Sequence, residues 1–372
     1  MSDDFMPIKG IDHVEFYVGN AKQAAHYYRT GFGFHLTAYS GLETQQRQYA
    51  SYVLEQGKIR LVLTAPLSPD SPIARHVHLH GDGVQVIALE VNDAAAAYRE
   101  TTQRGATGAI PPTQLEDEQG VLRYSAIRCY GDSLIKFVDR SDYHGVFAPG
   151  YAARNGADGE GHSRPRTHKG LGLAHIDHIV GNVELGAMNR WVDFFAGTMG
   201  FSQLVHFSDR DISTEYSALM SKVMQNGNGK IKFPINEPAE GKKRSQIQEY
   251  LDYYYGPGVQ HIACSTGNIL KTVTQMRENG IEFLRVPNTY YADLEARVGK
   301  INEPVDKLAE LGILVDRDDD GYLLQIFTKP VQDRPTVFYE VIERHGSRGF
   351  GQGNFKALFE SIEREQALRG NL

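Results

Sequence analysis

The sequence contains an internal repeat, and this repeat constrains the fold more than any other feature. Residues 11–20 read IDHVEFYVGN and residues 176–183 read IDHIVGNV, so Ile-Asp-His and Val-Gly-Asn recur. Each run is apolar and rich in β-branched residues, which predicts a buried strand that ends in a turn. A helix-like segment with aromatic residues and a turn containing Gly-Phe follows each run. We therefore expect the two halves of the chain to share one fold.

A second pair of segments extends the repeat. Residues 81–88 (GDGVQVIA) align with residues 256–263 (GPGVQHIA). Each is followed by a helix-like stretch that ends near Gly105 or Gly280, where a left-handed residue can close a helix. The chain is therefore predicted to contain four strand-helix-strands units, two in each half.

The length of the chain also favours two domains. A chain of 372 residues exceeds what one hydrophobic core usually serves. Residues 147–169 are rich in Gly, Ala, Arg and His and lack periodicity, which is typical of a linker. We predict one domain over residues 1–150, a linker over 151–170 and a second domain over 171–372.

Composition excludes several classes of function. The net charge is −7 and the longest basic cluster is Lys242-Lys243-Arg244, so nucleic acid and anionic membranes are poor partners. Cys129 and Cys264 lack a CxxC spacing, which argues against a disulfide framework or a thiolate zinc site. The chain has no signal-peptide pattern and no apolar run near the roughly 18 residues of a membrane span. We therefore expect a soluble, cytoplasmic protein.

Three predicted strands of the second half each carry one residue of a type that binds metal ions. These residues are His178, His261 and Glu340. Because side chains alternate on a strand, each should share its face with apolar neighbours; for His178 these are Ile176 and Val180. A carboxylate in such a place is costly unless it is paired or bound to a metal. Two imidazoles and one carboxylate are the ligands of non-haem Fe(II) oxygenases.

The first half of the chain provides an internal control for this triad. Val86 aligns with His261 and Lys136 aligns with Glu340, so only His13 remains there. A scaffold duplicated for structural reasons alone would not need a triad in either half, which favours a metal site in the second half. His175 and Asp177 imitate the H-x-D pair of 2-oxoglutarate oxygenases, but they lie on the opposite strand face from His178, and we do not expect them to bind the ion.

Over nearly all of its length the sequence resembles the 4-hydroxyphenylpyruvate dioxygenase family, two-domain members of the vicinal oxygen chelate superfamily. Six blocks in order carry the resemblance: IDHIVGNV (176–183), FPINEP (233–238), GVQHIA (258–263), LLQIFTKP (323–330), FYEVIER (338–344) and GFGQGNF (349–355). The resemblance implies an α+β fold of two tandem vicinal oxygen chelate domains. Each would be an open, barrel-like sheet built from two βαβββ modules, and a C-terminal helix would follow.

The resemblance also implies roles for single residues. One Fe(II) per chain would be held by His178, His261 and Glu340. The polar catalytic positions would be Ser221, Asn236, Gln246, Gln260 and Gln325. The substrate pocket would be lined by Phe327, Phe338, Phe350, Asn354, Phe355 and Phe359. In the tail, apolar residues recur at helical spacing from Phe355 to Ile362, which predicts an amphipathic helix that closes over this pocket.

The implied activity is the Fe(II)-dependent conversion of 4-hydroxyphenylpyruvate and O₂ into homogentisate and CO₂, in tyrosine and phenylalanine catabolism. The reaction combines oxidative decarboxylation, ring hydroxylation and side-chain migration. We also expect a homo-oligomer, a dimer or a tetramer.

Three alternatives remain open. A 4-hydroxymandelate synthase would use the same substrate and ion, although Asn236 and Phe338 follow the dioxygenase pattern. An extradiol catechol dioxygenase would turn over catechols. A non-catalytic binding protein of the same scaffold would bind no iron.

Overall fold

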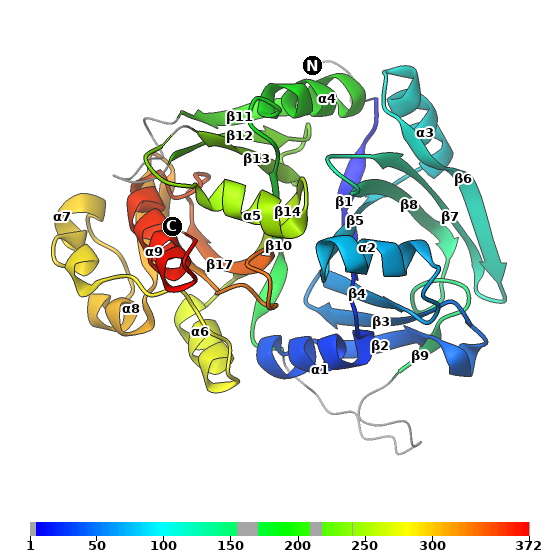
Figure 1. The fold of residues 1–372 in the computed structure, drawn as a ribbon, viewed down its shortest axis with the longest axis horizontal. Coiled ribbons are helices and arrows are strands. Elements are labelled where there is room, and N and C mark those ends of the chain that lie inside the picture. The colour runs from blue at the N-terminus through cyan, green and yellow to red at the C-terminus, as the bar shows by residue number, and fades with distance from the viewer. Residues whose placement is uncertain (1–4, 155–169, 209–217, 240, 372) are drawn as a thin grey trace.

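The computed structural model describes residues 5–154, 170–208, 218–239 and 241–371. The chain folds into two halves that lie side by side, each with a curled β-sheet (Figure 1). The grey segments of Figure 1 include residues 155–169, so most of the predicted linker lies outside the described residues.

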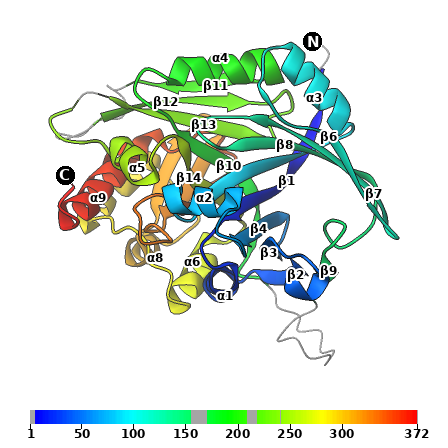
Figure 2. The ribbon, with the colours of Figure 1, turned by 45° about the vertical axis from the view of Figure 1, so that its right-hand side comes forward.

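The first half runs from β1 to β9. Its elements are β1 (Ile8–Tyr17), α1 (Ala21–Phe32), β2 (His35–Ser40), the 3₁₀ turn η1 (Leu42–Thr44), β3 (Tyr49–Gln56), β4 (Ile59–Pro66), α2 (Pro72–His80), β5 (Gly83–Val91), α3 (Ala94–Gln103), β6 (Gly108–Asp117), β7 (Gly120–Arg128), β8 (Leu134–Tyr143) and β9 (Ala152–Ala153). Figure 2 shows β6 and β7 as a long ribbon at the edge of this half. The short strand β9 lies in the predicted linker and pairs with β2; the predicted domain boundaries stay a prediction.

The second half repeats this order with additions. Its elements are β10 (Leu173–Asn182), α4 (Met188–Met199), β11 (Ser202–Phe207), β12 (Ala218–Gln225), β13 (Lys232–Ala239), α5 (Gln246–Tyr254), β14 (Gly258–Thr266), α6 (Ile269–Glu278), η2 (Asn288–Tyr291), α7 (Leu294–Val298), α8 (Val305–Leu311), β15 (Leu314–Asp318), β16 (Gly321–Phe327), β17 (Phe338–His345), η3 (Gln352–Asn354) and α9 (Phe355–Leu368). The elements η2, α7 and α8 are inserted between α6 and β15. The predicted tail helix is α9.

Sheet topology confirms the four predicted modules. Within the described residues, the strand order is β6-β7-β8-β5-β1-β4-β3-β2-β9 in the first sheet and β11-β12-β13-β10-β14-β17-β16-β15 in the second. In every module the first strand is parallel to the last, and a helix connects the first strand to the second. The first strands of the two modules, β1 with β5 and β10 with β14, pair antiparallel at the centre of each sheet. This is the α+β architecture that the resemblance implied.

The Gly-Phe turns explain why the first helix of each half ends where it does. Gly33 after α1 and Gly200 after α4 have φ angles of 75° and 71°, a left-handed conformation that residues with a Cβ rarely adopt. The phenylalanines that follow, Phe34 and Phe201, are buried in the main core. Each turn therefore stops a helix and anchors the next segment at once.

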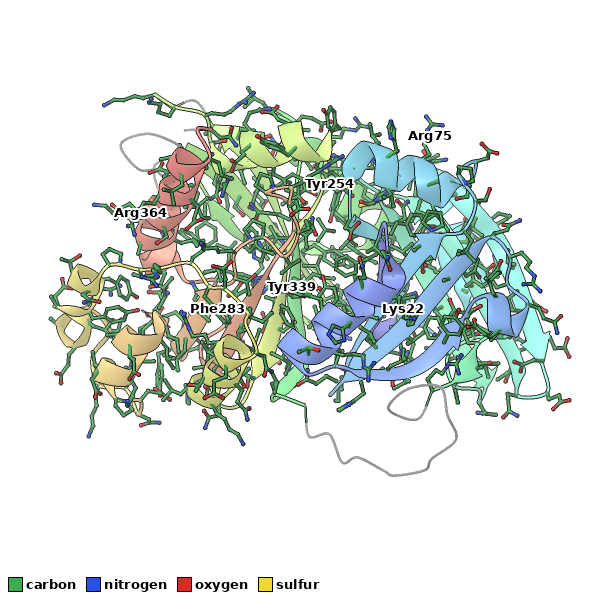
Figure 3. All side chains as sticks on the ribbon, turned by 60° about the horizontal axis from the view of Figure 1, so that its bottom comes forward. Lys22, Arg75, Tyr254, Phe283, Tyr339 and Arg364 are labelled. Atoms are coloured by element: carbon green, nitrogen blue, oxygen red, sulfur yellow. The ribbon has the colours of Figure 1, made fainter. Side chains whose placement is uncertain are left out.

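Aromatic side chains join the two halves. The Tyr339 ring of β17 lies 4.9 Å from the Phe32 ring of α1, and the Tyr254 ring stacks on the His80 imidazole at 4.4 Å. Tyr254 and Tyr339 lie along the boundary between the halves in Figure 3. Burying such rings is the main driving force for this contact. None of the helices in the described part of the chain has the length and apolar character of a membrane span.

Candidate metal centre and substrate pocket

Three neighbouring strands of the second sheet bring the predicted metal ligands together. His178 is on β10, His261 on β14 and Glu340 on β17, and these strands are adjacent in the sheet. Ala263 of β14 is opposite both His178 and Glu340, while His261 is opposite Val180. The ligands therefore lie on one concave face, and each is buried, with 3% (His178), 9% (His261) and 3% (Glu340) of the residue exposed.

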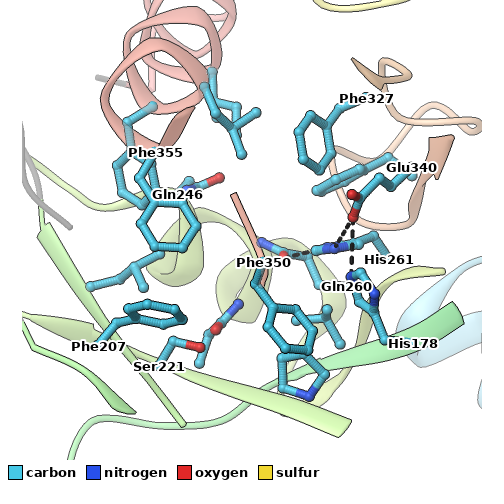
Figure 4. Close-up of a pocket in the computed structure, with 18 of the residues that line it drawn as sticks. His178, Phe207, Ser221, Gln246, Gln260, His261, Phe327, Glu340, Phe350 and Phe355 are labelled. Carbon is cyan, nitrogen blue, oxygen red and sulfur yellow. Dashed lines mark hydrogen bonds and ion pairs between the residues drawn. The ribbon is translucent and has the colours of Figure 1, made fainter. Parts of the chain in front are cut away.

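The ligand atoms converge on one point. The Nε2 atoms of His178 and His261 lie 3.1 Å and 3.5 Å from Oε2 of Glu340 (Figure 4). One possible ligand atom from each residue lies within 4.8 Å of those of the other two. Burial opposes ionisation of Glu340, but the two imidazoles outweigh it and lower the pKa of this carboxyl to about 2. The centre therefore presents an anionic oxygen beside two imidazole nitrogens.

The outer nitrogens of both imidazoles are already bonded. Nδ1 of His178 lies 2.8 Å from Oδ1 of Asp177, and Nδ1 of His261 lies 3.0 Å from Oε1 of Gln260. An acceptor at Nδ1 holds the proton there, which leaves the Nε2 lone pair free for a metal ion. Asp177 is fixed in turn by Arg344, whose Nε and Nη2 each donate to it at 2.8 Å.

A β-bulge aims His178 into the sheet's concave face. The register of β10 against β14 shifts between Ile176 and His178. Ile176 and Ile179 therefore pack in the main core, while His178 and Val180 line the pocket. The prediction that Ile176 shares the face of His178 was wrong, because simple alternation cannot anticipate an extra residue in the strand. His175 bonds Ser265 through Nδ1, away from the centre.

These donors fit a resident metal ion. Two imidazoles and one carboxylate on one side of a pocket are the donor set found in non-haem Fe(II) oxygenases. The described residues hold a second possible group, Glu303, Glu343 and His345, but it is partly exposed. Glu343 is also occupied there, accepting a hydrogen bond from the backbone of Ile269.

The pocket beside the centre contains most of the predicted substrate residues. Those in its lining are Ser221, Asn236, Gln246, Gln260, Phe327, Phe338, Phe350, Phe355 and Phe359. Figure 4 shows Phe327 close to Glu340 and Phe207 with Ser221 across the pocket from them. The Phe338 ring stacks on the His261 imidazole with the centroids 4.8 Å apart. One wall is therefore aromatic, and apart from the His-His-Glu triad the polar side chains of the lining are neutral.

Two predicted residues lie next to this pocket rather than in its lining. Gln325 is buried on β16, two residues before Phe327, and its amide lies against Gly351. Asn354 is fully buried, and its side-chain oxygen accepts a 2.6 Å hydrogen bond from the Tyr290 hydroxyl. Their predicted roles stay untested.

Sequence reasoning missed several apolar lining residues. These are Val180, Phe207, Leu219, Val223, Pro234, Leu358 and Ile362. The alternation of Leu219, Ser221 and Val223 on β12 would have indicated two of them, because residues two apart share a strand face. Leu358 and Ile362 belong to the apolar stripe that predicted α9.

The helix α9 covers the pocket and is tied down near its end. Phe359 packs in a cluster with Phe207, Leu219 and residues of α5. Arg369 donates to both oxygens of Glu249 on α5, at 3.1 Å and 2.8 Å. Apolar packing and a partly exposed ion pair thus hold the helix over the site.

Comparison with known proteins agrees with this geometry. A family model described as "Glyoxalase/Bleomycin resistance protein/Dioxygenase superfamily" matches residues 10–128 and 173–326. A 4-hydroxyphenylpyruvate dioxygenase of Aspergillus fumigatus is 45% identical, with 100% of this chain and 96% of the relative covered. One from Dictyostelium discoideum is 46% identical, covering 98% of this chain and all of the relative.

The chain also resembles a solved structure along its whole length. This is a mutant 4-hydroxymandelate synthase from Streptomyces coelicolor, which is 30% identical and superposes with a TM-score of 0.84. The alignment covers 97% of this chain and 100% of that protein.

Proposed function

The chain belongs to the 4-hydroxyphenylpyruvate dioxygenase family, and on that premise we propose that His178, His261 and Glu340 hold the Fe(II) ion of its reaction. It is an enzyme that converts 4-hydroxyphenylpyruvate and O₂ into homogentisate and CO₂. The observation that carries the iron assignment is the convergence of the two Nε2 atoms on the Glu340 carboxylate, with both Nδ1 atoms already bonded. Fe(II) bound there would supply redox chemistry with O₂ and one uncompensated positive charge for a 2-oxo acid.

The neutral polar residues suit the task of orienting the substrate. Ser221, Asn236 and Gln246 line the pocket together with Gln260. Hydroxyl and amide groups can donate or accept hydrogen bonds without taking the proton of a phenol. We assign none of them as a strong base, and propose that they fix the position of the ring and its hydroxyl group. Gln260 also accepts a hydrogen bond from His261, so it would contact both the substrate and one of the proposed metal ligands.

Aromatic residues and α9 would keep water out during the reaction. Phe327, Phe338 and Phe350 surround the metal-binding side chains, and Phe355 and Phe359 close the pocket from α9. Excluding water protects reactive oxidised species and strengthens electrostatic contacts in the site. Release of product then requires α9 to move or to open a path beside it.

Oxygen uptake and product identity test this proposal together. Purified chain with Fe(II) should consume O₂ with 4-hydroxyphenylpyruvate, release CO₂ and form homogentisate, and a chelator should stop the reaction. Homogentisate and 4-hydroxymandelate are isomers, so chromatography against both standards must accompany mass spectrometry. No O₂ uptake with the iron-loaded chain would contradict the assignment.

The likeness to a 4-hydroxymandelate synthase supports a second candidate product. That activity would use the same substrate, the same ion and the same pocket. The curated relatives at 45% and 46% identity favour the dioxygenase. If 4-hydroxymandelate were the product, the metal assignment would stand and the reaction class would change.

Assembly and location stay predictions. We propose a homo-oligomer, a dimer or a tetramer, which light scattering would test. A cytoplasmic location would be tested by cell fractionation.

A further inference from the structure

The first half of the chain encloses a cavity of its own. Its volume is about 270 Å³, compared with about 80 Å³ for the pocket beside the metal-binding side chains. It lies on the same face of the first sheet as the metal centre does in the second, because His13 lines it. A cavity of this size approaches the roughly 300 Å³ at which small-molecule pockets begin.

Two opposite charges face this cavity without pairing. Lys136 of β8 has no hydrogen bond or ion pair with any described residue, and its ammonium rests 4.5 Å from the centre of the Tyr124 ring. Glu15 of β1 accepts one 2.7 Å hydrogen bond from Thr64 and has no cationic partner among the described residues. Burial lowers the pKa of the Lys136 ammonium, with Glu15 acting in the opposite direction. Both residues are half-buried, and a charge that is partly withdrawn from water without an ion-pair partner is a candidate for a ligand contact.

Strand register shows how this cavity corresponds to the metal centre of the other half. Ala88 is opposite both His13 and Lys136, as Ala263 is opposite both His178 and Glu340. Lys136 therefore stands where the second half has the Glu340 carboxylate.

The same register shows that Glu15 stands in place of Val180 and Val86 in place of His261. Glu15 is opposite Val86, as Val180 is opposite His261. An ammonium in place of a carboxylate and a valine in place of an imidazole remove metal binding from this cavity. What remains is one positive and one negative side chain in the lining of the same cavity.

The other groups of the cavity do not satisfy these two charges. Arg140, which also lines it, donates to both oxygens of Asp12. Nδ1 of His13 is bonded to Asp12, and burial lowers the pKa of this imidazole, so it is a neutral group at pH 7.

The walls are apolar and aromatic. The side chains that form them include Val62, Ile73, Leu122, Tyr124, Phe147 and Tyr151. A simple anion would be attracted by Lys136 but repelled by Glu15, and a simple cation would be attracted by Glu15 but repelled by Lys136. A molecule with one charge of each sign on a small apolar body satisfies both residues at no net charge.

We propose that this cavity is a second ligand site that binds a free α-amino acid with an apolar or aromatic side chain. The α-carboxylate would contact Lys136, the α-ammonium would contact Glu15, and the side chain would lie against Tyr124 and Phe147. Arg140 and Asp12 would stay paired and hold the strands in place.

Three probes that share the phenyl ring and differ in which charged groups they carry test the proposal on the full-length, iron-loaded chain. L-Phenylalanine carries both charges, 3-phenylpropionate lacks the ammonium and phenethylamine lacks the carboxylate. In isothermal titration calorimetry, phenylalanine should bind in the millimolar range or tighter, and each of the other two at least about tenfold more weakly. No binding of phenylalanine at about 10 mM would overturn the proposal, as would equal binding of all three.

Two variants locate the site. Lys136→Met and Glu15→Gln should each weaken phenylalanine binding at least about tenfold and leave O₂ uptake unchanged. Since each removes a different charge, Glu15→Gln decides the matter if Lys136→Met does not fold. His261→Ala, in the other half, should bind phenylalanine as the parent chain does. Loss of binding in His261→Ala alone would place the amino acid in the metal-side pocket and overturn the proposal.

Discussion

The variant Asp177→Asn tests whether Asp177 supports metal binding in addition to stabilising the fold. The internal repeat offers a matched control, Asp12→Asn in the first half. Asp177 accepts from Nδ1 of His178 and from two nitrogens of Arg344. Asp12 makes the same contacts with His13 and Arg140 in the first half, where Arg60 also lies 3.6 Å from its Oδ2. The two aspartates share bulge position, burial and partners, but only one of them supports a predicted metal ligand.

The size of the effect follows from these contacts. Asparagine keeps the shape and one acceptor oxygen but leaves the half-buried arginine without the counter-charge of the buried aspartate. Removing one member of a buried ion pair costs about 3 kcal/mol of unfolding free energy, and we expect this for both variants. Arg344 retains its hydrogen bond to the carbonyl of Gly349, which argues for the lower part of the usual range. Loss of the carboxylate behind a ligating imidazole should weaken metal binding about 10- to 100-fold, in Asp177→Asn only.

Two measurements check this prediction. Urea unfolding of the metal-free chains gives the stability of each variant, and competition with a chelator gives its Fe(II) affinity. The reasoning would be refuted if Asp12→Asn weakened metal binding as much as Asp177→Asn. It would also be refuted if Asp177→Asn lost stability while its metal affinity stayed unchanged.

The difference in stability between the parent chain and Asp12→Asn should depend on pH. Burial alone would raise the pKa of Asp12, but Arg140 and His13 outweigh it and hold the pKa well below its usual range. Because the folded pKa is depressed, the ionised carboxyl stabilises the fold fully above the unfolded pKa of about 3.9, and this contribution is lost as pH falls below it. The stability gap between the parent and Asp12→Asn should therefore shrink by about 1.4 kcal/mol per pH unit below about pH 4. A gap that stays constant from pH 6 to about pH 3 would contradict the ion-pair account.

Two further matched pairs test the site. His261→Ala should reduce bound iron from one ion per chain to a trace and abolish O₂ uptake, whereas His13→Ala should change neither. Metal analysis and oxygen-uptake measurements test this, and equal losses in both variants would contradict the metal assignment. Gly351→Ala places a Cβ 2.2 Å from Nε2 of Gln325 at a residue with φ of +74°, so the amide must move and the KM for 4-hydroxyphenylpyruvate should rise several-fold. Gly105→Ala, at φ of +100° with open space around it, should cost only about 1 kcal/mol of stability with an unchanged KM; a raised KM in both variants would exclude a specific role for Gln325.

The sequence was sufficient for the architecture and for the grouping of His178, His261 and Glu340, because both depend on periodicity and repetition; the role of the three as metal ligands stays a prediction. The repeat around His13 and His178 predicted the four modules, and strand alternation predicted that Glu340 faces inward. The alignment of Lys136 with Glu340 was correct, as the shared register with Ala88 and Ala263 shows.

Other features could not be predicted from local pattern. The bulge after Ile176 adds one residue to a strand, and its only sign in the sequence is the Ile-Asp-His triplet itself. Phe207 reaches the pocket from β11, and no local pattern predicted that β11 lies beside α9, because the contact between Phe207 and Phe355 joins segments nearly 150 residues apart. The side chain of Asn354 points to Tyr290, a partner supplied by the insertion that only the second half contains.

The bulge and its aspartate–arginine support are present in both halves, although only the second half has the triad of His178, His261 and Glu340. This persistence has a use in protein engineering. A second redox centre could be installed with as few as two exchanges, Val86→His and Lys136→Glu, because the third ligand, the His13 imidazole, is already present and held by Asp12. Such a chain would carry two ions of the same kind in homologous environments, only one of them covered by α9. Comparing the two centres would show what α9 contributes to turnover.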